Sequence, residues 1–168
     1  MIFLIHGKDS SEKSLTLNSF LKIIPNEKYF FITYDSNKSY KETFNTIDSQ
    51  LKNNNISEND IIVGHSLGGY WTIVFSHIYN TKKILINPCL IPTIVGIKDY
   101  KDLNEYLTFN RAGLCLTSSN DEVLGNNYEV CKEKLKSIEV VNIKETHRIT
   151  DFEKYKMNVN ELLGEYLW

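Results

Sequence analysis

A serine flanked by glycines follows a short apolar run near the middle of the chain. Ile61-Ile62-Val63 leads into Gly64-His65-Ser66-Leu67-Gly68-Gly69, which places a glycine two residues to either side of Ser66. A serine at a sharp strand-to-helix turn has strained backbone, and glycines at Gly64 and Gly68 avoid the clashes that larger neighbours would make. The pattern is typical of a nucleophile elbow, which exposes a serine hydroxyl for attack on a carbonyl carbon. The alternative is a glycine-rich turn with an incidental serine.

A serine hydroxyl is a weak nucleophile, so it needs a base that is itself oriented by a carboxylate. Two polar turns follow later strand-like runs and supply both groups. Asp121 comes shortly after the run 113–117, and His147 comes shortly after the run 138–143. The carboxyl ends of parallel strands meet at one edge of a sheet, and the chain order serine, acid, histidine fits this arrangement. We therefore expect Ser66, Asp121 and His147 to form a catalytic triad.

Each of these residues also has a simpler interpretation. Asp121 would serve as a helix cap or a solvated turn residue, and His147 as a solvated loop histidine. Glu122 and Glu145 are alternative acids, and spacing alone does not exclude Glu122, which is adjacent to Asp121.

The first apolar run is followed by His6-Gly7-Lys8-Asp9-Ser10. Gly7 allows a turn that would direct the backbone N–H of Lys8 toward a reacting carbonyl, with the N–H of Leu67 as the second oxyanion donor. The ammonium group of Lys8 is also suited to binding an anionic substrate. We interpret His6 and His77 as structural residues, and His65 lies in the elbow but not in the position of the base.

Apolar runs alternate with amphipathic segments, which predicts a largely parallel sheet with helices on both faces. The first strand and the strand before Ser66 are expected to be central neighbours, with the site at their carboxyl ends. The interval 88–110 has weak periodicity and predicts a short, lid-like excursion that contains a helix. Its aromatic residues Tyr100, Tyr106 and Phe109 are expected to be exposed, in the pocket or at a dimer contact. The expected strands are 2–5, 29–33, 61–63, 84–86, 113–117 and 138–143, and the expected helices are 10–24, 39–53, 67–79, 126–136 and 151–163.

Length and composition are those of an ordinary globular protein. The 168 residues are expected to form one domain over 1–168. A net charge of −2 without a basic cluster gives no reason to expect nucleic acid. The three cysteines, Cys89, Cys115 and Cys131, have neither disulfide nor zinc spacing, and Cys115 is expected in the core. We find no signal peptide or membrane span and expect a cytoplasmic protein.

Several of these motifs occur together in a known family. Five motifs follow one another in order along the chain: His6-Gly7, the elbow with Tyr70-Trp71, Ile86-Asn87-Pro88, the stretch 120–124 (Asn-Asp-Glu-Val-Leu) and Thr146-His147. In this the chain resembles the small bacterial YqiA/YcfP-type α/β-hydrolases over nearly its whole length. The resemblance implies a minimal α/β-hydrolase with esterase-type activity and a triad of Ser66, Asp121 and His147.

The sequence thus predicts a serine esterase for small acyl esters, with a preference for short acyl chains and no metal or organic cofactor. A thioesterase would use the same residues, and a peptidase is less favoured because nothing marks an extended groove. A non-catalytic binding module that keeps the fold is the alternative from a different class.

Overall fold

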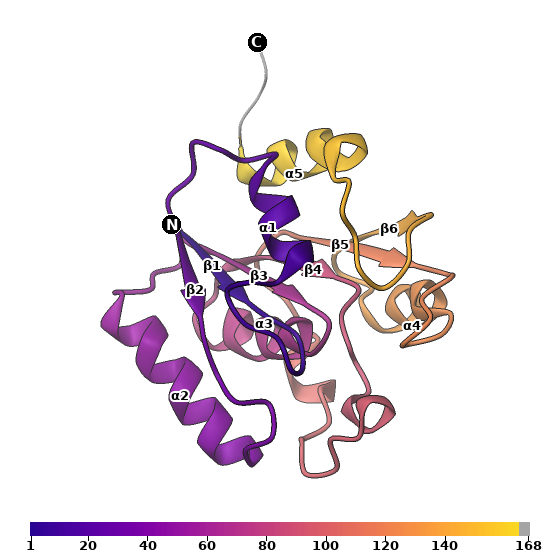
Figure 1. Cartoon of the computed structure of the whole chain (residues 1–168). Coiled ribbons are helices and arrows are strands. Elements are labelled where there is room, and N and C mark those ends of the chain that lie inside the picture. The colour runs from indigo at the N-terminus through magenta and orange to yellow at the C-terminus, as the bar shows by residue number, and fades with distance from the viewer. Residues whose placement is uncertain (165–168) are drawn as a thin grey trace.

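The computed structural model describes residues 1–164, in which six strands form one sheet between two layers of helices (Figure 1). All neighbouring strands are parallel, in the order β2-β1-β3-β4-β5-β6. The predicted three-layer α/β fold is confirmed, and β1 and β3 are central neighbours as expected. Residues 165–168 of the predicted domain lie outside the described part. The strands are β1 (Ile2–Ile5), β2 (Tyr29–Ile32), β3 (Ile61–His65), β4 (Lys82–Ile86), β5 (Gly113–Ser118) and β6 (Glu139–Ile143).

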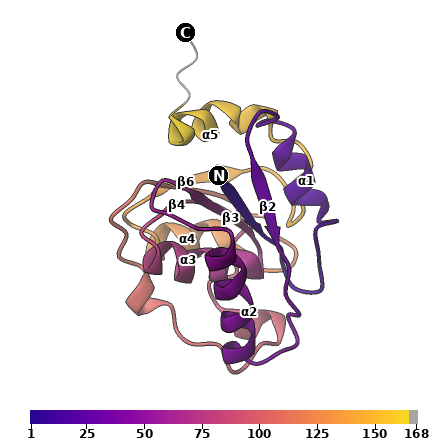
Figure 2. The same cartoon turned by 90° about the vertical axis from the view of Figure 1, so that its left-hand side faces the viewer.

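The helices lie on opposite faces of this sheet. Helices α1 and α5 cover one face, and α2, α3 and α4 cover the other (Figure 2). This division follows from right-handed crossovers between parallel strands, which reverse face where the direction of strand addition reverses. The helices are α1 (Leu15–Leu21), α2 (Tyr40–Asn53), α3 (Leu67–Ile78), α4 (Asn127–Lys134) and α5 (Lys156–Leu163).

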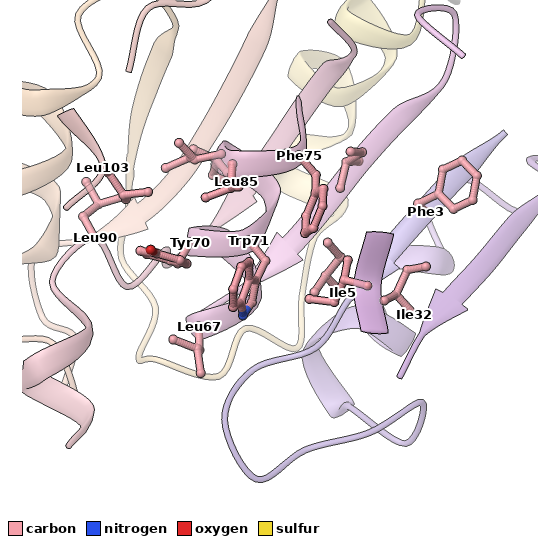
Figure 3. Packing of buried hydrophobic residues seen from close by; sticks show 14 of the residues in the cluster. Phe3, Ile5, Ile32, Leu67, Tyr70, Trp71, Phe75, Leu85, Leu90 and Leu103 are labelled. Carbon is pink, nitrogen blue, oxygen red and sulfur yellow. The ribbon is translucent and has the colours of Figure 1, made fainter. Parts of the chain in front are cut away.

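The central strands are buried on both faces, which explains why their sequences are continuously apolar. In β1, Ile2 and Leu4 pack toward α1 and α5, whereas Phe3 and Ile5 pack toward α2 and α3. On the second face, Trp71 of α3 is fully buried beneath the sheet (Figure 3). The core therefore fixes α3, and with it the turn that precedes α3.

Several helix ends differ from the prediction. The helix predicted over 10–24 begins at Leu15, because Ser14 is its N-cap and accepts a hydrogen bond from the Leu17 N–H at 3.4 Å. The helix predicted over 151–163 begins as a 3-10 turn, and regular α-helix starts only at Lys156. Sequence periodicity alone predicts helices that are too long at their N-terminal ends, because caps and short turns decide where a helix starts.

The excursion predicted over 88–110 is present, but it contains two 3-10 turns, Pro92–Val95 and Asn104–Tyr106, rather than an α-helix. Its aromatic residues are half-buried, so the expectation that they are exposed was wrong. The Tyr100 ring lies 5.0 Å from the Trp71 ring between centroids. This contact fastens the excursion to the α3 side of the molecule.

Strand order reverses between β1 and β3, so the connections that leave these two strands diverge. In a doubly wound sheet this divergence opens a crevice at the carboxyl ends of the strands. The loop from Gly7 and the turn at Ser66 both begin there. Within residues 1–164, no helix combines the length and apolar character that crossing a bilayer requires.

Candidate functional site

Ser66 occupies the strained turn between β3 and α3. Its backbone has φ 55° and ψ −121°, a conformation that residues with side chains seldom adopt. The two flanking glycines make the turn possible. A Cβ on Gly64 would lie 2.2 Å from the Gly68 carbonyl oxygen, and one on Gly68 would lie 2.0 Å from the Ile5 carbonyl oxygen. The spacing of glycines in the sequence therefore has the steric cause that was expected.

Hydrogen bonds from the neighbouring strand hold the turn in place. The Ser66 N–H donates to the Ile86 carbonyl at 3.0 Å, and the Ser66 carbonyl accepts from the Cys89 N–H at 2.9 Å. The last residue of β4 and the segment that follows this strand thus fix the backbone on both sides of the serine. Such external bonds are needed because the strained conformation would otherwise relax.

Three side chains from separate parts of the chain form one hydrogen-bonded series. The Ser66 Oγ lies 2.9 Å from the His147 Nε2, and the His147 Nδ1 lies 2.8 Å from the Asp121 Oδ2. All three residues are buried, with at most 7% of their surface exposed. The structure therefore brings together the serine, acid and base that the sequence predicted.

The two alternative acids lie elsewhere. Glu122 Oε2 accepts a hydrogen bond from the backbone N–H of His147 at 2.8 Å, so it contacts the loop rather than the ring. Glu145 forms an exposed ion pair with Lys154 at 3.2 Å. Of the three carboxylates, the structure places Asp121 against the imidazole.

The Asp121 carboxylate is held in one orientation. Its Oδ1 accepts hydrogen bonds from the N–H groups of Val123 at 2.9 Å and Leu124 at 2.8 Å, which leaves Oδ2 for His147. Burial alone would raise the pKa of Asp121, but the hydrogen bonds from His147 and from these two amides outweigh it and lower the pKa. The carboxylate is therefore ionised at neutral pH.

His147 is also held by its backbone. Its carbonyl oxygen accepts hydrogen bonds from His65 Nε2 at 3.0 Å and Asn87 Nδ2 at 3.1 Å. Burial, together with repulsion from His147, lowers the pKa of His65 to about 4, so the His65 ring is neutral. Its single proton must lie on Nε2, because that atom faces a carbonyl oxygen. His65 thus positions the His147 loop.

Asn87 links three strand ends. Its Oδ1 accepts from the Ser118 N–H at 2.8 Å, while its Nδ2 donates to the carbonyls of Thr146 and His147 at 3.1 Å each. The sequence signalled Asn87 only as part of a family motif, and His65 only as a neighbour of the serine. Their roles were not predicted, because both act on backbone groups far away in the sequence.

We predict that Asn87→Ala lowers kcat/KM of any reaction that uses Ser66 and His147 by about 100-fold, because the loop that carries His147 loses a support and small displacements at a reacting centre are costly. Unfolding in urea should show a loss of about 1–3 kcal/mol, since the buried Ser118 N–H is left unpaired. Asn142→Ala is the matched control, because this exposed asparagine contacts Ser119 at the surface. Equal activities of the two variants would refute the positioning role of Asn87.

The remaining histidines are structural in their contacts, as expected. His6 is buried, donates from Nδ1 to the Gly7 carbonyl at 2.8 Å, and accepts at Nε2 from the Tyr34 N–H at 3.3 Å. His77 contacts the Thr108 carbonyl at 3.2 Å near the end of α3. Cys115 is fully buried in the core, as predicted. Among residues 1–164, no group of three His, Cys, Asp or Glu side chains is arranged to hold a metal ion.

The predicted oxyanion donors lie beside the serine. Gly7 approaches so closely that a Cβ there would be 3.0 Å from the Ser66 Cβ. The next residue, Lys8, lines the same cavities as Ser66, and Leu67 is the first residue of α3. Within the described chain, neither the Lys8 nor the Leu67 backbone N–H donates to a protein acceptor. The assignment of these two amides as oxyanion donors stays a prediction.

Two cavities meet at Ser66. The first, of about 290 Å³, extends toward the segment before α1, and the second, of about 570 Å³, extends toward the turn Pro92–Val95. Ser66, His147, Lys8 and Arg148 line both of them. The hydrogen-bonded series of Ser66, His147 and Asp121 thus opens onto a groove that continues in two directions.

Comparison with known sequences identifies the family. A model described as "Uncharacterised protein family (UPF0227)" matches residues 1–108. The chain belongs to the UPF0227 family. A UPF0227 protein from Shewanella woodyi is 29% identical over 157 aligned residues, which cover 78% of this chain and 86% of the relative. The resemblance predicted from the motifs is thereby confirmed.

Solved structures share the fold of this UPF0227 member. A carboxylesterase from Bacillus subtilis superimposes with a TM-score of 0.70 at 10% identity, over 99% of this chain and 84% of its own. An esterase from Pyrococcus furiosus superimposes with a TM-score of 0.71 at 13% identity, over 98% of this chain and 81% of its own. An alpha-beta serine hydrolase homologue from Coxiella burnetii superimposes with a TM-score of 0.67 at 12% identity, over 99% of this chain and 85% of its own. At these identities the likeness establishes the α/β-hydrolase fold.

Proposed function

We propose that the protein is a serine hydrolase that cleaves small carboxylic esters through an acyl-enzyme on Ser66. One observation carries the proposal, namely the continuous contact from Ser66 Oγ through the His147 ring to Asp121 Oδ2, at 2.9 Å and 2.8 Å. The strained backbone of Ser66 and the α/β-hydrolase fold of the chain also support this proposal. These distances match the geometry in which a histidine accepts a serine proton.

In the first half-reaction the Ser66 oxygen attacks the ester carbonyl while His147 Nε2 takes its proton. Asp121 stabilises the imidazolium cation that forms and keeps Nδ1 protonated. The N–H groups of Lys8 and Leu67 donate to the developing oxyanion, and removal of one such donor typically costs about 3 kcal/mol of transition-state stabilisation. His147 then protonates the leaving alkoxide, and the acyl group stays on Ser66.

In the second half-reaction a water molecule replaces the alcohol. His147 Nε2 removes a proton from the water as the water oxygen attacks the acyl carbon. The tetrahedral intermediate then collapses, the bond from Ser66 Oγ to the acyl carbon breaks, and His147 returns the proton to Oγ as the carboxylic acid leaves. All proton transfers pass through Nε2, and the cycle needs neither a metal nor an organic cofactor. An acyl thioester would react through the same steps.

A fluorophosphonate probe tests the assignment. The protein should gain one phosphonyl group on Ser66, detected by intact-mass and peptide mass spectrometry. Parallel assays with para-nitrophenyl butyrate and butyryl-CoA compare ester with thioester cleavage. Folded protein that neither reacts with the probe nor cleaves either substrate would favour a non-catalytic binding module instead.

We predict a preference for short acyl chains. The cavity beside Pro92–Val95 offers the apolar side chains of Ile94, Val95 and Val123, and the excursion above it contains no α-helical lid. At about 0.8 kcal/mol per buried methylene, kcat/KM should rise from acetate to butyrate and then stop rising. A series of para-nitrophenyl esters from acetate to decanoate measures this. Fastest cleavage of the decanoate would contradict the prediction.

A further inference from the structure

The two cavities that meet at Ser66 differ in chemistry. We call the one toward α1 the basic lobe; Lys13, Thr16 and His65 line it and not the other cavity. We call the other the apolar lobe; Ile94, Val95 and Val123 line it and not the first. Ile94 and Val123 are 51% and 44% exposed, so both offer apolar surface to a bound group.

Positive charge is concentrated in the basic lobe. Lys8, Lys13 and Arg148 face a single carboxylate there, Asp9, although the whole chain has a net charge of −2. In the apolar lobe, Lys8 and Arg148 are matched by Asp9 and Glu122. The excess of positive charge is therefore local and lies on one side of the serine.

Lys8 differs from the other two cations because it is already engaged. Its Nζ donates to the Val95 carbonyl at 2.9 Å and lies 3.9 Å from Asp9 Oδ2. Within residues 1–164, neither Lys13 nor Arg148 is in ion-pair contact with a carboxylate. Arg148 is also close enough to the elbow that its charge helps to lower the pKa of His65. Two cations without a carboxylate partner among residues 1–164 thus line the cavity that Ser66 also lines.

We infer that the substrate carries a carboxylate or phosphate group on one side of the scissile bond and a small apolar group on the other side. Lys13 and Arg148 bind the anionic group in the basic lobe, and the apolar group lies in the apolar lobe. The inference rests on the proposed function and specifies its substrate class. The anionic group is a recognition element and exchanges no proton or bond during hydrolysis. An anion held by two cations at a partly open site gains affinity that salt weakens.

Matched esters test this inference. The neutral reference is para-nitrophenyl butyrate. In the first anionic ester the nitrophenyl ring of this compound carries an added carboxylate. The second anionic ester is para-nitrophenyl hemiglutarate, which has the carboxylate on the acyl side. One of the two anionic esters should exceed the neutral ester about tenfold in kcat/KM at low salt, and the preferred ester identifies the side that enters the basic lobe. Lys13→Gln and Arg148→Gln should each reduce this ratio about threefold to fivefold.

Controls separate the inference from the proposed function. Lys41→Gln, a lysine on α2 outside both lobes, should leave the ratio of anionic to neutral ester unchanged. Binding of the three esters to Ser66→Ala by calorimetry reports recognition without turnover. Anionic esters that bind and react no better than the neutral ester would overturn the inference even in an active enzyme. Preferential anion binding that disappears in Lys13→Gln and Arg148→Gln, without turnover by the wild type, would support the site and refute the hydrolase assignment.

Discussion

Ser66→Ala is expected to lower kcat for para-nitrophenyl butyrate by about 10⁶-fold, to the level that oxyanion donors and substrate binding supply without a nucleophile. The reason is that the proposed mechanism forms the acyl-enzyme on Ser66 Oγ, the oxygen that lies 2.9 Å from His147 Nε2. Steady-state rates and the loss of fluorophosphonate labelling measure the effect. Circular dichroism should remain that of the wild type, because the substitution removes one hydroxyl and keeps the backbone turn.

Ser76→Ala is the matched control for this experiment. Ser76 lies on α3, the helix that follows Ser66, and is buried, but its hydroxyl donates to the Ile73 carbonyl within the helix at 3.3 Å. It should keep near wild-type activity. If Ser66→Ala retained more than about a tenth of the wild-type rate, attack by Ser66 would be refuted, since known triads lose several orders of magnitude.

Asp121→Asn is expected to lower kcat by about 10⁴-fold while the protein stays folded. The amide oxygen of the new asparagine should face the Val123 and Leu124 N–H groups, which already bond Oδ1 at 2.9 Å and 2.8 Å. Its NH₂ group would then point at His147 Nδ1 and force the imidazole proton onto Nε2. In that tautomer Nε2 cannot accept the proton of Ser66, and the negative charge that stabilises the imidazolium is lost as well.

Glu122→Gln provides the comparison for the acid. Its side chain accepts from the His147 backbone N–H at 2.8 Å, and the amide oxygen of glutamine can accept the same bond. We expect a loss of less than about tenfold, because the imidazole keeps its charged partner. The rates of Asp121→Asn and Glu122→Gln across pH 5–9, corrected for the folded fraction by urea titration, would decide which carboxylate is the acid of the triad. A larger loss in Glu122→Gln than in Asp121→Asn would identify Glu122 as the acid.

The sequence by itself determined the features that depend on short-range sterics and hydrophobic pattern. The glycines around Ser66 are needed because a Cβ at Gly64 or Gly68 would collide with backbone oxygens, and this holds for any chain that makes the turn. Continuous apolar strands predicted a parallel sheet that is buried on both faces. The order of serine, acid and histidine, each shortly after a strand, then predicted that these three residues lie at one edge of the sheet.

Only the tertiary structure decided how those residues are held. It places the Asp121 carboxylate, and not that of Glu122, against the imidazole, because two loop amides hold one oxygen of Asp121 and leave the other for His147. Adjacent positions in a sequence do not distinguish these two placements. The tertiary structure also brings Asn87 and His65 onto the His147 carbonyl and divides the groove into two lobes. These contacts join residues 60 and 82 positions apart, and such pairings arise from the packing of strands rather than from local spacing.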